Sequence, residues 1–147
     1  KMITSVPGAS DVFDFGVVTY SNPVKFRVLG VSESTLADKG AVSKECVREM
    51  ARGAMALSHA DIAVSVSGIA GPEGGSEDKP VGLVWFGLRV KRNGKAVRAE
   101  YPCLFRGDRA RIQLFASLTA LDLMRLAAED ATSARRRDVA FLAREYL

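Results

Sequence analysis

The glycine-rich stretch of residues 67–82 has residue types suited to binding a small molecule. It follows residues 62–67, where branched apolar and small residues alternate as they do in a packed strand. Glycine tolerates positive φ and exposes bare backbone N–H groups, and such concavities bind anions, above all phosphate. We therefore expect backbone N–H groups of residues 68–76 to contact a ligand, while a long connection without a ligand is the alternative. The glycines expected to contact it are Gly68, Gly71, Gly74 and Gly75.

The spacing of these glycines excludes two common phosphate-binding motifs. Gly68, Gly71 and Gly74 do not form the G-x-G-x-x-G pattern of dinucleotide-binding domains. No Gly-Lys-Ser or Gly-Lys-Thr closes the stretch as in a P-loop. The loop therefore indicates an anion site of another kind.

Lys25 is the candidate for proton transfer. It lies just after an expected strand, and if Asn22 caps the following helix, Lys25 is the third helical residue. A cation there opposes the positive end of the helix dipole, and partial burial acts in the same direction. Both effects favour neutral lysine, the form that a general base needs, and Tyr20 could orient a reacting group nearby. An exposed lysine carrying its charge in water is the alternative.

Arg109 is a third candidate, at the start of the last long helix expected here. Asp108 is suited to cap that helix, and Arg109 could reach an anion. A solvated arginine is an equally good interpretation.

Composition narrows the class of protein. The chain has 147 residues, enough for one domain with a core, and a net charge of +4. Its basic runs carry no interleaved aromatic residues, so we expect no nucleic-acid partner and favour an anionic small molecule. No apolar run approaches the roughly 20 residues that a membrane span needs.

The few Cys and His residues argue against a metal site. Cys46 and Cys103 have neither metal-ligand spacing nor a disulfide pattern, and His59 is the single histidine. We expect two reduced packing cysteines in a cytoplasmic protein, with no metal and no cofactor.

Helical and strand patterns interleave along the chain, and Asn93-Gly94 predicts one antiparallel hairpin. This combination predicts an α/β layered domain with a mixed sheet. The expected strands are residues 12–20, 62–67, 81–90 and 96–105. The expected helices are residues 22–30, 32–39, 43–57, 108–128 and 133–147.

Several short motifs, taken in order, resemble one family. They are Val6-Pro-Gly-Ala-Ser10, Gly16-Val-Val-Thr-Tyr-Ser-Asn22 with Lys25, Gly40-Ala-Val-Ser43, Ser67-Gly-Ile-Ala-Gly-Pro72, Lys79-Pro-Val-Gly82 and Gly107-Asp-Arg109. They make residues 1–128 similar to the C-terminal domain of the competence/damage-inducible protein CinA, which includes nicotinamide-nucleotide amidases. Residues 129–147 lie outside the resemblance and are expected to form a helical extension.

The resemblance implies a three-layer α/β/α domain that hydrolyses the carboxamide of nicotinamide mononucleotide to the acid nucleotide and ammonia. It implies a serine nucleophile with Lys25 as base, Tyr20 beside it, and Ser67, the loop glycines and Arg109 as substrate contacts. It also implies a role in pyridine nucleotide salvage and a homodimer or other homo-oligomer.

Two departures from the family pattern stand out. The family's nucleophile lies in a Glu-Ser-x-Thr-Gly-Gly stretch just upstream of the part that matches Lys1, and residues 1–147 contain no such stretch. We therefore expect the serine upstream and residues 1–147 alone to be inactive. The alternative is a non-catalytic nucleotide-binding or protein-interaction module of the same fold. The second departure is Gln113, where many relatives carry arginine.

Overall fold

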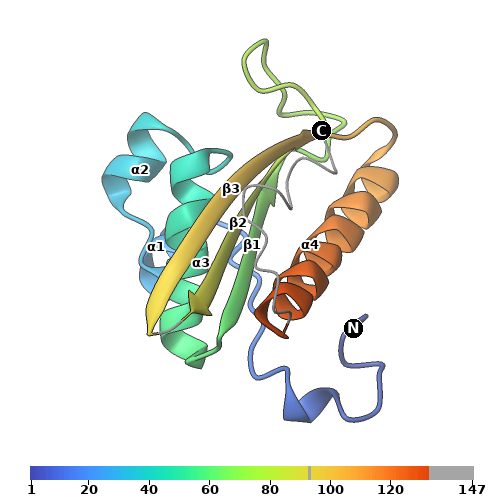
Figure 1. The fold of residues 1–147 in the computed structure, drawn as a ribbon. Coiled ribbons are helices and arrows are strands. Elements are labelled where there is room, and N and C mark those ends of the chain that lie inside the picture. The colour runs from blue at the N-terminus through green and yellow to red at the C-terminus, as the bar shows by residue number, and fades with distance from the viewer. Residues whose placement is uncertain (93, 133–147) are drawn as a thin grey trace.

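The fold is a three-layer arrangement in which one sheet lies between helices (Figure 1). The structure, a computed structural model, describes residues 1–92 and 94–132. Helix α3 packs on one face of the sheet and helix α4 on the other. The elements in chain order are η1 (Ala9–Asp11), α1 (Asn22–Leu29), α2 (Glu33–Asp38), α3 (Lys44–Ser58), β1 (Ile62–Gly68), β2 (Leu83–Arg92), β3 (Lys95–Leu104) and α4 (Arg109–Thr132).

Strand β2 is the centre of the sheet, because β1 and β3 pair with its two edges. Its alternate residues point to one face and form a core against α4. Burying these side chains is the main source of stability on this face of the sheet. The buried members of this cluster are Val84, Phe86, Leu88 and Val90 of β2, Tyr101 of β3, and Ile112, Ala116, Leu123 and Ala127 of α4.

The opposite face of the sheet is covered by α3, which in turn supports α1. Ser43 caps α3 by accepting a hydrogen bond from the backbone N–H of Cys46 at 3.2 Å. A second buried cluster joins the two helices and consists of Leu29, Val31, Cys46 and Met50. The position of α1, and of any side chain it carries, therefore depends on α3.

The α/β layered class is confirmed, but the described strands pair only antiparallel, whereas a mixed sheet was expected. The difference lies in residues 12–20, which were expected to form a strand and have no regular secondary structure. Val18 and Tyr20 are 85% and 83% exposed. The segment follows the free edge of β1 without pairing to it. β-Branched residues favour a strand, but a strand forms only when its backbone pairs with a neighbouring strand.

The other expected elements are found within a few residues of the expected bounds. Ser21, not Asn22, precedes the first residue of α1, so Lys25 is the fourth helical residue and its N–H already bonds the Ser21 carbonyl. The hairpin register pairs Arg92 with Lys95 across the predicted turn, of which Asn93 lies outside the described residues. Helix α4 continues to Thr132, and the expected helix 133–147 also lies outside them.

We predict that Gly53→Ala destabilises the fold, although Gly→Ala within a helix ordinarily stabilises by about 1 kcal/mol. A Cβ at Gly53 would overlap the backbone carbonyl of Leu29, where the end of α1 crosses α3. Overpacking of this kind costs roughly 1–3 kcal/mol. Urea unfolding of the two proteins measures the difference, and a more stable alanine variant would show that the helices separate freely.

Candidate active site

Lys25 is buried at the N-terminal part of α1, with 6% of its surface exposed. Its Nζ donates hydrogen bonds to the backbone carbonyls of Thr19 at 2.8 Å and Tyr20 at 3.2 Å. A neutral amine has two N–H groups, so both are used and the lone pair is left free. An ammonium has a third N–H, which would remain available to a ligand. The two carbonyls thus fix the direction of the amine in either protonation state.

The structure brings Lys25 and the glycine loop to one cavity of about 480 Å³. This volume is within the range of small-molecule sites. All but one of the site residues predicted from sequence line it: Tyr20, Lys25, Ser67, Gly68, Gly71, Gly74 and Arg109. Gly75 is the exception; it lies against Val81, whose backbone N would be 2.9 Å from a Cβ at position 75.

A second cavity of about 430 Å³ adjoins Lys25 along the free edge of β1. It shares Tyr20, Lys25, Val66, Ser67 and Gly68 with the first cavity and extends between residues 15–20 and α3. Lys25 is therefore reached from two sides. We call the first cavity the loop cavity and the second the edge cavity.

The glycine loop is held in shape by its own backbone and by two hydrogen bonds to other parts of the chain, one donated by Lys79 of the loop and one by Arg109 of α4. Gly71 has φ +73°, and a Cβ there would lie 2.6 Å from a methyl group of Val81, so the position requires glycine. The Lys79 side chain donates to the Lys39 carbonyl at 2.5 Å. Arg109 donates from Nη1 to the Gly71 carbonyl at 2.9 Å.

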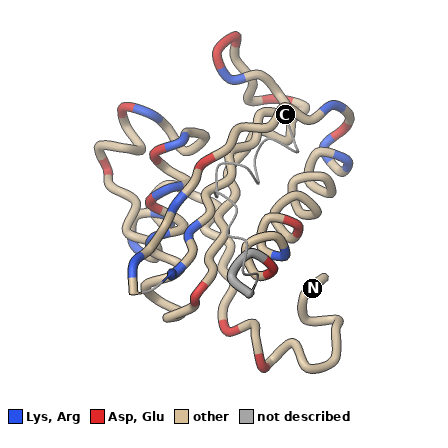
Figure 2. Tube along the Cα trace, viewed as in Figure 1, with Lys and Arg blue, Asp and Glu red and all other residues tan. Residues whose placement is uncertain are grey.

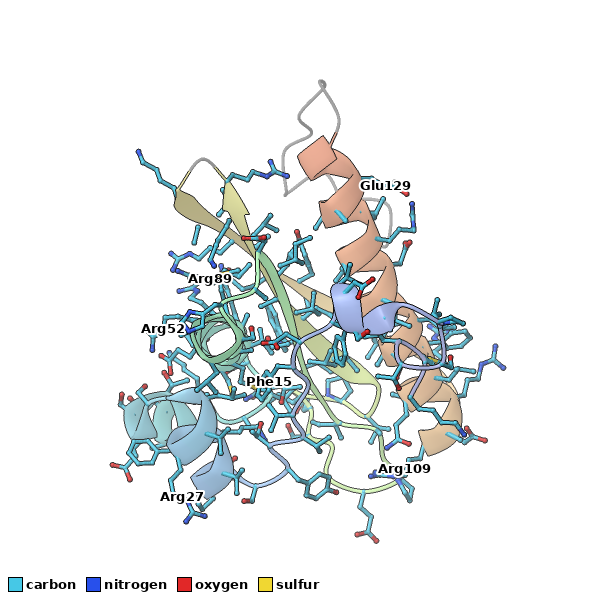
Figure 3. The ribbon with its side chains drawn as sticks, turned by 90° about the horizontal axis from the view of Figure 1, so that it is seen from below. Phe15, Arg27, Arg52, Arg89, Arg109 and Glu129 are labelled. Atoms are coloured by element: carbon cyan, nitrogen blue, oxygen red, sulfur yellow. The ribbon has the colours of Figure 1, made fainter. Side chains whose placement is uncertain are left out.

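Arg109 has a structural contact that the sequence did not predict. We expected it to reach an anion, and it does line the loop cavity, but one of its donors is bonded to the loop. The remaining guanidinium N–H groups are available to a ligand. In Figure 3 Arg109 lies near the end of α4 from which the helix starts.

Sequence reasoning did not identify three polar residues that line the loop cavity: Asn22, Glu73 and Gln113. The sequence pattern predicts Asn22 as a helix cap and marks Gln113 only as a departure from the family pattern. Tyr20 contributes its carbonyl to Lys25, a role carried by backbone that a side-chain pattern does not indicate.

Cys46 lies in α3, in the helical layer that supports α1, and is fully buried. Burial raises the pKa of its thiol to about 11, while the charge of Lys25 acts in the opposite direction. Burial also raises the pKa of Cys103. Both cysteines are free and, with raised pKa values, are poor nucleophiles at neutral pH.

Among the described residues, no three His, Cys, Asp or Glu side chains are grouped to hold a metal ion. Within the same part of the chain no helix is long and apolar enough to cross a membrane.

Comparison with known proteins identifies the family. The family model of the CinA C-terminal domain matches residues 1–128. The chain belongs to the CinA C-terminal domain family. The nicotinamide-nucleotide amidohydrolase PncC of Enterobacter agglomerans is 53% identical over 121 residues, which are 82% of this chain and 72% of that protein. The PncC of Escherichia coli K12 is 49% identical over 124 residues, 84% of this chain and 73% of that protein.

Other members of the CinA family are longer. A CinA-like protein of Geobacter metallireducens is 47% identical over 123 residues. These residues are 84% of this chain and 29% of that relative, and the chain spans the same 29% of two relatives from Caldicellulosiruptor.

Solved structures of CinA proteins share the fold. The competence damage-inducible protein A of Klebsiella pneumoniae superposes with a TM-score of 0.77 at 38% identity, over 86% of this chain and 76% of that one. The competence/damage inducible protein of Agrobacterium tumefaciens gives 0.77 at 42% identity, over 85% and 74%.

The raised pKa of Cys46 predicts a pH dependence of stability. The stabilisation is fully present below the ordinary thiol pKa of 9.0 and is lost as pH rises through about 11, because only the unfolded thiol ionises in that interval. The free energy of unfolding should fall by about 2 to 3 kcal/mol from this group. Urea unfolding between pH 7 and 11 measures it.

Cys46→Ala is the control for this experiment. The alanine leaves a small void that lowers stability equally at every pH. The contribution of Cys46 is the difference between the two pH profiles, and parallel profiles would contradict the prediction.

Proposed function

We propose that this domain hydrolyses the carboxamide of nicotinamide mononucleotide, releasing ammonia and the acid nucleotide. The observation that carries the proposal is the convergence of the buried Lys25 amine and the glycine loop on the loop cavity. The names of the PncC relatives, which the chain matches at about half identity, supply the substrate class.

In the proposed mechanism Lys25 is the general base for a serine. The neutral amine takes the proton of the serine hydroxyl as its oxygen attacks the amide carbon, and the resulting ammonium returns a proton to the departing nitrogen. The C–N bond breaks, ammonia leaves, and water then cleaves the acyl-serine ester. The carbonyls of Thr19 and Tyr20 support this role because they hold both N–H groups away from the lone pair.

The glycine loop is proposed to bind the negative charges of the substrate. Backbone N–H groups near Gly71 and Gly74 would contact the phosphate or the oxyanion that forms on the carbonyl oxygen. Ser67 and the free donors of Arg109 line the same cavity and would orient the nucleotide. Tyr20, at the cavity mouth with an exposed ring, would lie against it.

The nucleophile is proposed to lie outside residues 1–147, in a Glu-Ser-x-Thr-Gly-Gly stretch encoded upstream. One observation favours the second candidate function, a non-catalytic module that binds nucleotides or a protein: residues 1–147 lack that stretch. The two candidates share the ligand cavity and differ in turnover.

Ammonia release from nicotinamide mononucleotide separates the two candidates. The chain extended by its encoded upstream residues should turn the substrate over, and residues 1–147 alone should bind it without turnover. No turnover by a folded extended protein that carries the serine would exclude the amidase and leave the binding module.

Lys25→Ala in the extended protein should lower turnover on the order of 10²-fold or more. Lys25→Arg should not restore it, because arginine stays protonated. The matched control is Lys44→Ala, which removes an exposed lysine of α3 and should leave turnover unchanged. Thermal unfolding of each variant shows that the loss is chemical, and near-normal turnover of Lys25→Ala would assign Lys25 a packing role.

We further propose that the protein acts as a homo-oligomer in the cytoplasm, within pyridine nucleotide salvage. Light scattering of the purified chain measures the oligomer directly.

A further inference from the structure

A second concave site lies on the α3 face of the sheet, at the β2–β3 hairpin end. The cavity has a volume of about 550 Å³. It is distinct from the loop cavity, because Val84 of β2 lines the loop cavity and Lys91 of β2 lines this one. Seven residues of strand separate them, or roughly 23 Å at about 3.3 Å per residue. We call it the hairpin cavity; its lining includes Arg52, Met55, Ala56, His59, Asp61, Arg89, Lys91 and Ala96.

The hairpin cavity has an excess of positive charge. Arg52 from α3 meets Arg89 and Lys91 from β2, and Figure 3 shows Arg52 and Arg89 side by side. Figure 2 shows the blue cations gathered around this end of the sheet. Asp61 is the carboxylate in the lining, and it is 3.9 Å from the Lys91 amine with its side chain 88% exposed.

The register adds a further cation at the rim. Arg98 of β3 is directly opposite Arg89 of β2, so both side chains are on the face that α3 covers. Like charges directly opposite across two strands destabilise a sheet. No hydrogen bond or ion pair joins either guanidinium to the described part of the chain.

One turn away along α3, the corresponding arginine, Arg48, has its charge neutralised by a carboxylate. Arg48 donates to both carboxylate oxygens of Glu100, at 2.8 and 3.3 Å. Glu100 is two residues from Arg98 on the same face of β3, and Arg52 is one helical turn from Arg48. Strand β3 therefore places the Glu100 carboxylate opposite Arg48, and places Arg98 opposite Arg52. Within residues 1–92 and 94–132, Arg52 makes one side-chain hydrogen bond, of 3.4 Å, to the carbonyl of Gly30.

We propose that the hairpin cavity binds a diphosphate or triphosphate group, held by Arg52, Arg89 and Lys91 with Arg98 at the rim. A guanidinium group can donate two parallel hydrogen bonds to the oxygens of one phosphate. A ligand with several negative charges offsets the repulsion among the cations. The cavity is concave and its described lining has no Phe, Tyr or Trp, which favours a compact ligand over a single-stranded nucleic acid. The group is either inorganic or the tail of a nucleotide whose base rests on Met55 and Ala56.

Calorimetric titration of the chain with inorganic triphosphate tests the proposal. Saturable binding is expected, and Arg89→Gln and Arg52→Gln should each weaken it at least 10-fold. Arg27→Gln, which removes an equal charge from the exposed side of α1, should change it less than twofold. Lys25→Ala should also leave it intact, which separates this site from the loop cavity. Orthophosphate should bind more weakly than triphosphate.

Two further arms identify the source of the group. ATP binding at least 10-fold tighter than inorganic triphosphate assigns a nucleotide, and equal affinities assign the phosphates alone. Absence of saturable binding at millimolar triphosphate, or equal losses in Arg89→Gln and Arg27→Gln, would overturn the proposal. So would tighter binding of a single-stranded oligothymidylate that the same variants weaken.

Discussion

The close approach of α3 to the sheet is the contact on which the site geometry depends. The Ser65 hydroxyl of β1 donates to the carbonyl of Val47 in α3 at 2.6 Å. The same carbonyl lies over Gly87 of β2, at a distance where a Cβ would overlap it. A hydrogen bond and a missing side chain thus fix α3 on the sheet, and the crossing at Gly53 then fixes α1 on α3. Lys25 takes its position from this sequence of contacts.

The site combines a rigid amine with a tethered loop. Lys25 is positioned by two carbonyls of the segment that precedes its helix. The loop is positioned by two hydrogen bonds to residues outside it. Arg109 donates to the Gly71 carbonyl, and Lys79 of the loop donates to the Lys39 carbonyl. Pre-organised groups of this kind need little rearrangement when a ligand binds.

Helix positions and the hairpin were predictable because they rest on local signals. Ser43, Asp108 and the apolar spacing of α3 and α4 decide those elements by themselves. The strand expected at residues 12–20 was wrong because a strand also needs backbone pairing with a neighbour, and these residues follow the free edge of β1 without pairing to it. The convergence of Lys25 and Gly71 was predicted because each residue follows a segment expected to be a strand. Of these two segments, only the one before Gly71, β1, is a strand.

Contacts made by backbone atoms, and contacts between elements far apart in the chain, could not be predicted from the sequence. The acceptors of Lys25 are carbonyls, which every residue has. The pairing of Arg89 with Arg98 follows from the hairpin register, yet its opposition to Arg52 depends on how α3 is placed. The hydrogen bond from Arg109 to the Gly71 carbonyl joins residues that are 38 positions apart in the chain.

The two tethers of the glycine loop have a topological consequence. Lys39 follows α2 in the helical layer on one side of the sheet, and Arg109 begins α4 on the other. Through the hydrogen bonds of Lys79 and Gly71, the loop connects the two helical layers across the end of the sheet. The spacing of the helical layers at this end is thus set by hydrogen bonds as well as by core packing, and anything that draws the loop inward also draws the two layers together.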